Sequence, residues 1–180
     1  IVSVVAGYLD AGLPEVCQSF DYLGTGVAHS QAGKALAFAG ALSRYRKALG
    51  FCDIVHLHIS AKGSYLRKSF MARMARRRGK KIVLHSHDGE FKKTFEEGDK
   101  SFRDSVRRTF GLADRVIVLS EEWRDYFAEH VCSPNKIDVL HNGVRVPPKA
   151  TEPWLHQDIL FLGRLDANKS PDVLLRASRR

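Results

Sequence analysis

Short apolar runs alternate with longer amphipathic stretches along most of the chain. Runs of strand length, rich in Val, Ile and Leu, predict strands at residues 15–23, 53–59, 81–85, 115–119 and 136–140. Apolar positions at helical spacing predict helices at residues 1–13, 34–49, 64–78, 102–112 and 121–130. This alternation is typical of a parallel sheet with helices on both faces, in which ligands bind beyond the carboxyl ends of the strands. We therefore predict an α/β fold with a doubly wound parallel sheet.

Single residues mark the ends of several of these elements. Gly50 and Gly79 follow helical patterns, as glycine does at helix C-termini, and Ser120 precedes one, as capping residues do. Residues 87–99 are polar and predict a loop of unusual length, and long loops often carry functional residues.

The periodic pattern breaks at residues 145–157, which contain three prolines. Proline interrupts regular structure, so we interpret this stretch as a linker between one unit, 1–144, and the start of a second, 158–180. The second unit would open with a strand at 159–162 and a helix capped by Ser170. It is too short to bury a core of its own. Position 1 is not methionine and the last helical pattern has no cap, so we expect an internal piece of a longer protein.

Composition and charge narrow the class of protein. The 180 residues are 44% hydrophobic, which suits a globular core, and the formal net charge of +9 favours anionic partners. The three cysteines, Cys17, Cys52 and Cys132, are far apart, so neither a disulfide framework nor a zinc knuckle is indicated and a reducing cytoplasm fits best. No apolar run approaches the roughly 20 residues of a spanning helix.

Two pairs of cations lie beside predicted helix N-termini. Arg164 and Lys169 bracket a strand-to-helix turn that would bind a phosphate or diphosphate, and the alternative is a solvated loop. Ser64, Arg67 and Lys68 fall in the first predicted turn of their helix, where they would hold an anion such as an acceptor phosphate. A cap with two solvated charges is the alternative, although cations oppose the helix dipole at that end.

A cluster of six cations follows along this helix and just beyond its end. Phe70, Met71 and Met74 lie among them, which is typical of a helix lying on anionic lipid, and a solvated charged face is the alternative. No nucleic-acid partner is expected, because no binding motif or stacking platform accompanies the charge. The six are Arg73, Arg76, Arg77, Arg78, Lys80 and Lys81.

Two H-x-H pairs lie on successive predicted strands, and such pairs are a possible sign of a metal site. Zinc and iron need three or four converging ligands, which a sequence does not display, so we expect no metal and structural roles for His56 and His85. His58 and His87 fall where a doubly wound sheet places its ligand crevice, and His87 would hydrogen-bond or exchange a proton with a bound hydroxyl. Asp88 and Glu90, which follow the second pair, would be the further ligands of a metal.

Six motifs in order resemble one enzyme family. They read D-I-V-H-L-H-x-S, G-S-x-x-R-K, H-x-H-D-G-E-F, V-I-V-L-S-E-x-W, I-x-V-L-H-N-G-V and G-R-L-x-x-x-K. Together they resemble family 4 retaining glycosyltransferases of the GT-B type, and bacterial exopolysaccharide transferases in particular. The resemblance makes 1–144 the acceptor-side Rossmann-like domain, without its first strand and Gly-Gly turn. The E-x7-E segment of the family is missing, since Glu121 and Glu129 share its spacing but precede the last motif.

The resemblance also implies a role for each site residue. Arg164 and Lys169 would bind the diphosphate of a nucleotide sugar without a required metal or other cofactor, and His87 would lie near the transferred sugar. The implied acceptor-side residues are His58, Ser64, Arg67, Lys68, Asp88 and Glu90, and the implied interdomain residues are Asn142 and Gly143.

These observations predict a glycosyltransferase that moves a sugar from a nucleotide donor to a lipid-linked acceptor in polysaccharide or glycoconjugate synthesis. We expect it to be cytoplasmic and peripheral on the inner face of the cell membrane, and the 180 residues alone to be inactive. One alternative is a non-catalytic basic module that binds anionic lipid or nucleic acid. The other is a metal hydrolase.

Overall fold

The computed structural model describes residues 19, 21–25, 31–60, 62–143, 161, 165 and 170–178. The chain divides into two units, Ile1–Val144 and Arg145–Arg180. The second unit contributes one described helix, α8 (Pro171–Ala177), which starts at a proline as predicted. Ser170 precedes it, but its side chain makes no capping hydrogen bond.

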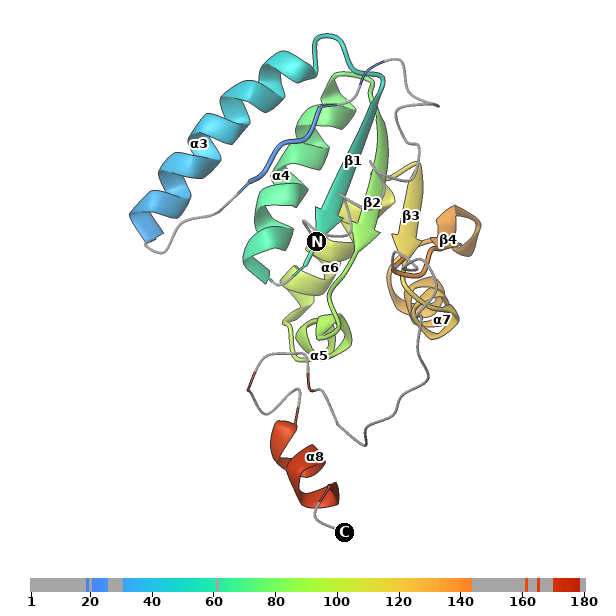
Figure 1. Ribbon diagram of the computed structural model, residues 1–180. Helices are drawn as coiled ribbons and strands as arrows, with labels where there is room; N and C mark the ends of the chain where they lie inside the picture. Colours follow the sequence, from blue (N-terminus) through green and yellow to red (C-terminus); the bar gives the residue numbers. More distant parts are fainter. Residues whose placement is uncertain are drawn as a thin grey trace, which may run out of the picture. The chain divides into compact units, whose positions relative to one another are not determined.

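The first unit is an α/β structure built on a parallel sheet (Figure 1). Its strands are β1 (Ile54–Ile59), β2 (Lys81–Ser86), β3 (Arg115–Val118) and β4 (Ile137–Val139), and they pair in this order. Its helices are α3 (Gln31–Ala48), α4 (Lys62–Arg77), α5 (Phe91–Glu96), α6 (Lys100–Gly111) and α7 (Glu121–His130), with a short 3-10 helix η1 (Pro134–Lys136) before β4. The predicted α/β fold with a parallel sheet is confirmed.

Helices α4, α6 and α7 cover one face of this sheet. Helix α4 packs against β1 and β2, and α7 packs against β3 and β4. Phe110 of α6 and Phe127 of α7 meet edge to face with ring centroids 5.2 Å apart, and both are fully buried. The four strands are neighbours in the sheet in the order of the sequence. Right-handed crossovers between such strands place all the connecting helices on the same face of the sheet. Helices on the second face stay a prediction, because the described residues do not test them.

Buried apolar residues alternate with histidines and other residues along the strands, so the sheet has one face in the core and another that carries the histidines. Val55, Leu57 and Ile59 of β1 are buried in the core, whereas Ile54 before them and His56 between them are exposed. The same alternation continues in β2 and β3, whose core residues are Ile82, Leu84, Val116 and Val118. The histidines of the two H-x-H pairs therefore lie on the face opposite α4, α6 and α7.

The predicted loop at residues 87–99 is wrong, because it contains helix α5. Phe91 and Phe95 lie four positions apart on this helix and are 6% and 3% exposed, so the burial of two aromatic rings holds six residues in helical form. Asp99 then caps α6 by accepting a hydrogen bond from the Phe102 N–H.

The predicted strand at residues 15–23 is also wrong for the residues that can be described. Ser19 and residues 21–23 form no strand. Asp21 and Tyr22 are exposed, and Leu23 is partly buried against the core. The remainder of that prediction, the helix at 1–13 and the linker at 145–157 lie outside the described residues.

Two predicted helix boundaries are confirmed in detail. Gly79 follows α4 with a φ of 68°, the left-handed conformation that glycine adopts without strain. Ser120 precedes α7 and accepts a hydrogen bond from the Trp123 N–H at 3.3 Å. Within the portion of the chain that is described, no helix has both the length and the apolar character needed to span a bilayer.

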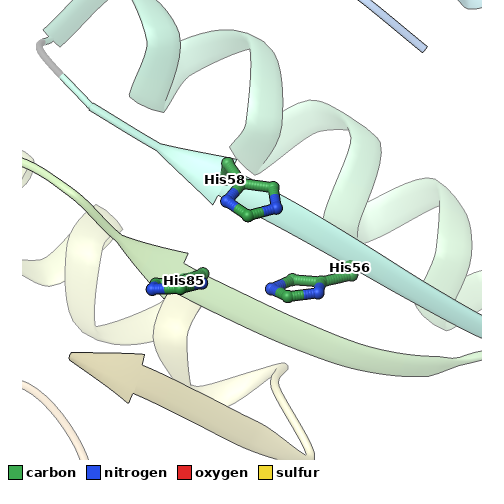
Figure 2. Close-up of side chains that lie close together, drawn as sticks. All are labelled: His56, His58 and His85. Carbon is green, nitrogen blue, oxygen red and sulfur yellow. The ribbon is translucent and has the colours of Figure 1, made fainter. Parts of the chain in front are cut away.

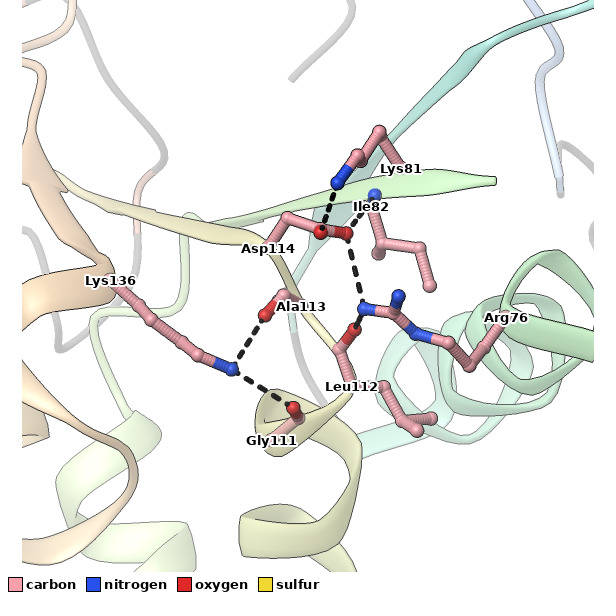
Figure 3. A network of polar contacts seen from close by, with 8 residues as sticks. All are labelled: Arg76, Lys81, Ile82, Gly111, Leu112, Ala113, Asp114 and Lys136. Carbon is pink, nitrogen blue, oxygen red and sulfur yellow. Dashed lines mark hydrogen bonds and ion pairs between the residues drawn. The ribbon is translucent and has the colours of Figure 1, made fainter. Parts of the chain in front are cut away.

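A polar network ties the amino ends of the strands together (Figure 3). The Asp114 carboxylate accepts a hydrogen bond from the Ile82 N–H at 2.9 Å and forms ion pairs with Arg76 at 3.1 Å and Lys81 at 3.3 Å. These contacts, the backbone hydrogen bond first, hold the pKa of Asp114 below its usual value. Lys136 adds hydrogen bonds to the carbonyls of Gly111 and Ala113, at 3.2 and 3.0 Å.

Candidate functional site

Four histidine rings gather at the carboxyl ends of β1 and β2, on the face away from the helices. His58 pairs with His85 in the register of the two strands, and the His87 N–H extends the pairing by donating to the Ile59 carbonyl at 2.8 Å. The rings of His56, His58 and His85 lie side by side over the two strands (Figure 2). Their centroids are 4.4 Å apart for His56 and His58 and 5.0 Å apart for His58 and His85, and His87 stacks on His85 at 4.0 Å.

This histidine cluster is uncharged at neutral pH. Burial, reinforced by the neighbouring imidazoles, lowers the pKa of His58 and of His85 to about 3. Burial is also the main cause that lowers the pKa of His87 to about 4, and burial lowers the pKa of His56. Each neutral ring offers one N–H donor and one lone pair. His58 Nδ1 and His87 Nε2 use one of each in a shared hydrogen bond of 2.8 Å.

A buried lysine lies on α4 beside this cluster. Lys68 is only 8% exposed, and its Nζ donates to the Thr25 hydroxyl at 2.6 Å. It forms no ion pair with any acidic residue that the structure describes. Burial, followed by repulsion from the Arg67 guanidinium, lowers the pKa of Lys68 to about 8. Buried cations usually have a counter-charge, and the described residues supply none to this ammonium group.

Arg67 is a second cation on the same helix. Its Nε atom is buried and makes no hydrogen bond to the described residues. Helix α4 begins at Lys62, two residues earlier than predicted, so Arg67 and Lys68 lie in its second turn and the predicted first-turn position is wrong. Ser64 Oγ accepts a long hydrogen bond of 3.4 Å from the Ser60 N–H and thereby fixes the entry to the helix.

The charge of Lys68 acts on the histidine cluster through the electrostatic field. Burial and the neighbouring histidines are the larger causes of the low pKa of His58, and the positive charge of Lys68 contributes as well. A small cavity of about 40 Å³ lies next to His87, at the ends of β2 and β3. A volume of this size is enough for water. It is lined by Ser86, His87, Asp88, Gly89, Val118, Leu119 and Trp123.

The remaining predicted site residues lie at the same edge of the sheet or outside the described residues. Asp88 follows β2 and its carboxylate accepts from the Glu90 N–H at 3.1 Å, so it shapes the turn before α5, and Glu90 itself is exposed. Asn142 and Gly143 are exposed and follow β4. Arg164 and Lys169 lie outside the residues that the structure describes.

The basic cluster on α4 differs in part from its predicted form. Met71 is 2% exposed and belongs to the core, so it does not lie among the surface cations as predicted. Phe70 and Leu66 are exposed instead, at 46% and 60%. Two of the six cations, Arg76 and Lys81, are held by Asp114.

Thr25, the partner of Lys68, was not found by sequence reasoning. It lies 43 residues before the lysine, between the predicted strand at 15–23 and the predicted helix at 34–49, and threonine there carries no periodic or motif signal. Only the fold brings the two side chains together.

The family is established by comparison with known proteins. A family model described as Glycosyltransferase Family 4 matches residues 12–146. The D-inositol 3-phosphate glycosyltransferase of Mycobacterium avium (strain 104) is 30% identical over 148 residues, which cover 72% of this chain and 34% of that protein. No solved structure matches the chain. Because the family model covers well over half of its length, the chain belongs to glycosyltransferase family 4. It spans about a third of the length of the curated relative.

Proposed function

We propose that the chain is the acceptor-binding part of an enzyme that transfers a sugar from a nucleotide sugar to an acceptor carrying a phosphate group. The observation that carries this proposal is the buried Lys68 ammonium, which has no acidic partner among the described residues. Its chain neighbour Arg67 has a buried Nε that makes no hydrogen bond to those residues either. A phosphate placed between them would supply the missing counter-charge and accept charge-assisted hydrogen bonds.

The relative supports a phosphorylated acceptor. Its name states D-inositol 3-phosphate, and a family member that uses a phosphorylated polyol needs cations on its acceptor side. A polyol phosphate and a lipid-linked phosphate present the same group to Lys68 and Arg67. We propose phosphate as the recognised chemistry, with the lipid-linked acceptor of a polysaccharide or glycoconjugate pathway as one source of it.

His87 would act on the acceptor hydroxyl at the end of β2. Its neutral ring, partly buried and hydrogen-bonded to His58, keeps a polar atom for a hydroxyl that is positioned by the phosphate in the neighbouring site. On the donor side, Arg164 and Lys169 would neutralise the charge that grows on the leaving diphosphate, so the donor step would need no metal. A GT-B architecture and retention of the anomeric centre complete this proposal.

A transfer assay tests the proposed activity. The protein encoded by the whole reading frame would be incubated with a panel of nucleotide sugars and matched acceptors, each with and without its phosphate, as soluble polyols and as lipid-linked forms. Transfer that requires the phosphate supports the proposal. Transfer to unphosphorylated acceptors only, or hydrolysis of the donor with every acceptor, contradicts it.

The exposed stripe on α4 supports a peripheral position on the inner face of the cell membrane. Leu66, Phe70, Arg73 and Arg77 are all exposed and follow one another at helical spacing, so apolar and cationic side chains share one face. Vesicles with anionic lipid should bind the chain, and the double variant Arg73→Gln with Arg77→Gln should bind less. Equal binding by the two proteins would exclude this surface.

A further inference from the structure

Three histidines on the second face of the sheet have the placement of a metal-binding set. His56 and His58 alternate on β1, and His85 on β2 is the register partner of His58. One ring nitrogen of each lies within 4.8 Å of the others (Figure 2). In the part of the chain that is described, this group consists of histidines alone, without a cysteine or an acidic residue.

We propose that His56, His58 and His85 bind a divalent transition-metal ion such as Zn²⁺, with a fourth position open to solvent or to an exogenous ligand. Three imidazole ligands and an open position are a known arrangement for zinc. Imidazole also suits Co²⁺, Ni²⁺ and Cu²⁺, which therefore serve as probes of the same site. This proposal departs from the expectation of no metal, and it stands independently of sugar transfer.

The distances are within reach of coordination. Tetrahedral Zn–N bonds of about 2.0–2.1 Å place the ligand nitrogens roughly 3.3 Å apart. The nitrogens lie within 4.8 Å of one another, so they have to approach by up to about 1.5 Å to bind one ion. His56 is the solvent-exposed member of the set, and its ring stacks on those of His58 and His85 with centroids 4.4 and 5.5 Å apart, whereas His85 is wholly buried. The rigid strand pair supplies two ligands at a set spacing and the exposed ring closes on the ion.

His87 completes the arrangement by orienting a ligand. Its Nε2 shares a hydrogen bond of 2.8 Å with His58 Nδ1. If His58 Nδ1–H donates to His87, the lone pair of His58 is on Nε2 and is directed to the metal. Ligating histidines commonly donate their second N–H in this way, which fixes the tautomer and raises the basicity of the ligand. His87 is therefore a positioning residue for the metal.

Zinc titration of the untagged 180-residue chain, followed by calorimetry, tests the proposal, with Co²⁺ absorption as a spectroscopic readout of coordination geometry. We expect one ion per chain and a d–d spectrum of tetrahedral type. His56→Asn changes an exposed side chain, so it should fold normally and weaken zinc binding by more than tenfold, and His87→Gln should weaken it by about tenfold to a hundredfold. His130→Gln, at a partly exposed histidine on α7, is the matched control and should bind as the unaltered chain does.

Three results would overturn the proposal. These are the absence of stoichiometric zinc binding by the folded chain, unchanged affinity in His56→Asn, and an equal loss of affinity in His130→Gln. Circular dichroism of each variant confirms that a loss of binding is not a loss of fold.

Discussion

The Nδ1 atom of His58 and the Nε2 atom of His87 lie 2.8 Å apart and join the ends of two neighbouring strands through their side chains. Strand pairing places the two residues on one edge, and the low pKa values of both rings, about 3 for His58 and about 4 for His87, keep the hydrogen bond between neutral partners at pH 7. The residue proposed to act on the acceptor hydroxyl is therefore held in position by a residue of the adjacent strand.

Replacing His87 should reduce the rate of transfer more than the binding of substrates. In His87→Ala, kcat should fall by about a hundredfold, the lower end of what a general acid or base contributes, with a small change in KM. Steady-state kinetics of the protein from the whole reading frame measures both. His130→Gln should leave them unchanged, and a His87→Ala protein with ordinary kcat would exclude a role for this residue at the reacting atoms.

The affinity for a phosphorylated acceptor should decline as the pH rises through about 8. Lys68 is protonated below the pKa of about 8 and loses its charge above it, whereas a phosphate monoester with a second pKa near 6 keeps its charge over this range. KM for the acceptor, measured from pH 7 to 9, should therefore rise. Lys68→Arg retains its charge throughout. If this variant shows the same rise, Lys68 is not the titrating group.

Asp114→Asn should destabilise the first unit and remove an acid-sensitive contribution. The carboxylate has a folded-state pKa below its unfolded value, so its contribution is present above about pH 4 and is lost as the pH falls through the folded pKa. We expect the free energy of unfolding to fall by about 1 kcal/mol, because the substitution weakens the hydrogen bond from Ile82 and removes two partly exposed ion pairs. Urea unfolding at pH 7 measures this change. Asp138→Asn is the control, because Asp138 and Arg115 are both more than half exposed and 3.5 Å apart.

Two glycine substitutions should have opposite effects on stability. Gly79 has a φ of 68°, which a residue with a Cβ adopts at a cost, so Gly79→Ala should destabilise by about 1 kcal/mol. Gly111 ends α6 with nothing within 4 Å of an added Cβ, so Gly111→Ala should be neutral or stabilising by up to about 1 kcal/mol. Thermal unfolding compares them. Equal shifts in Tm would show that backbone conformation is not the cause.

Local sequence patterns predicted the elements that depend on residues close together in the sequence. The alternation of Val55 and Leu57 with histidines predicted β1, and the position of Ser120 before α7 identified it as a helix cap. The same reasoning missed α5, because one pair of buried rings, Phe91 and Phe95, is too short a pattern to distinguish from a loop.

The site was predictable as a set of residue types but not as an arrangement. The H-x-H spacing shows that His56 and His58 share a face, but the pairing of His58 with His85 depends on strand order and register, which no local pattern contains. The buried state of Lys68 depends on Thr25 and on the start of α4, and the sequence had placed this lysine as a solvated or ligand-binding cation in the first turn. The pairing of the histidines and the burial of Lys68 both depend on packing between residues far apart in the sequence.

The measurement that tests the central claim most directly is the preference of Lys68→Met for phosphorylated over unphosphorylated acceptor. Removing the buried charge should lower kcat/KM for the phosphorylated acceptor by roughly a hundredfold, on the scale of about 3 kcal/mol for a charged hydrogen-bond partner, and leave the unphosphorylated acceptor almost unaffected. Lys68→Arg should retain most of the preference. A Lys68→Met enzyme that still discriminates as the unaltered enzyme does would contradict the claim that this lysine recognises the acceptor phosphate.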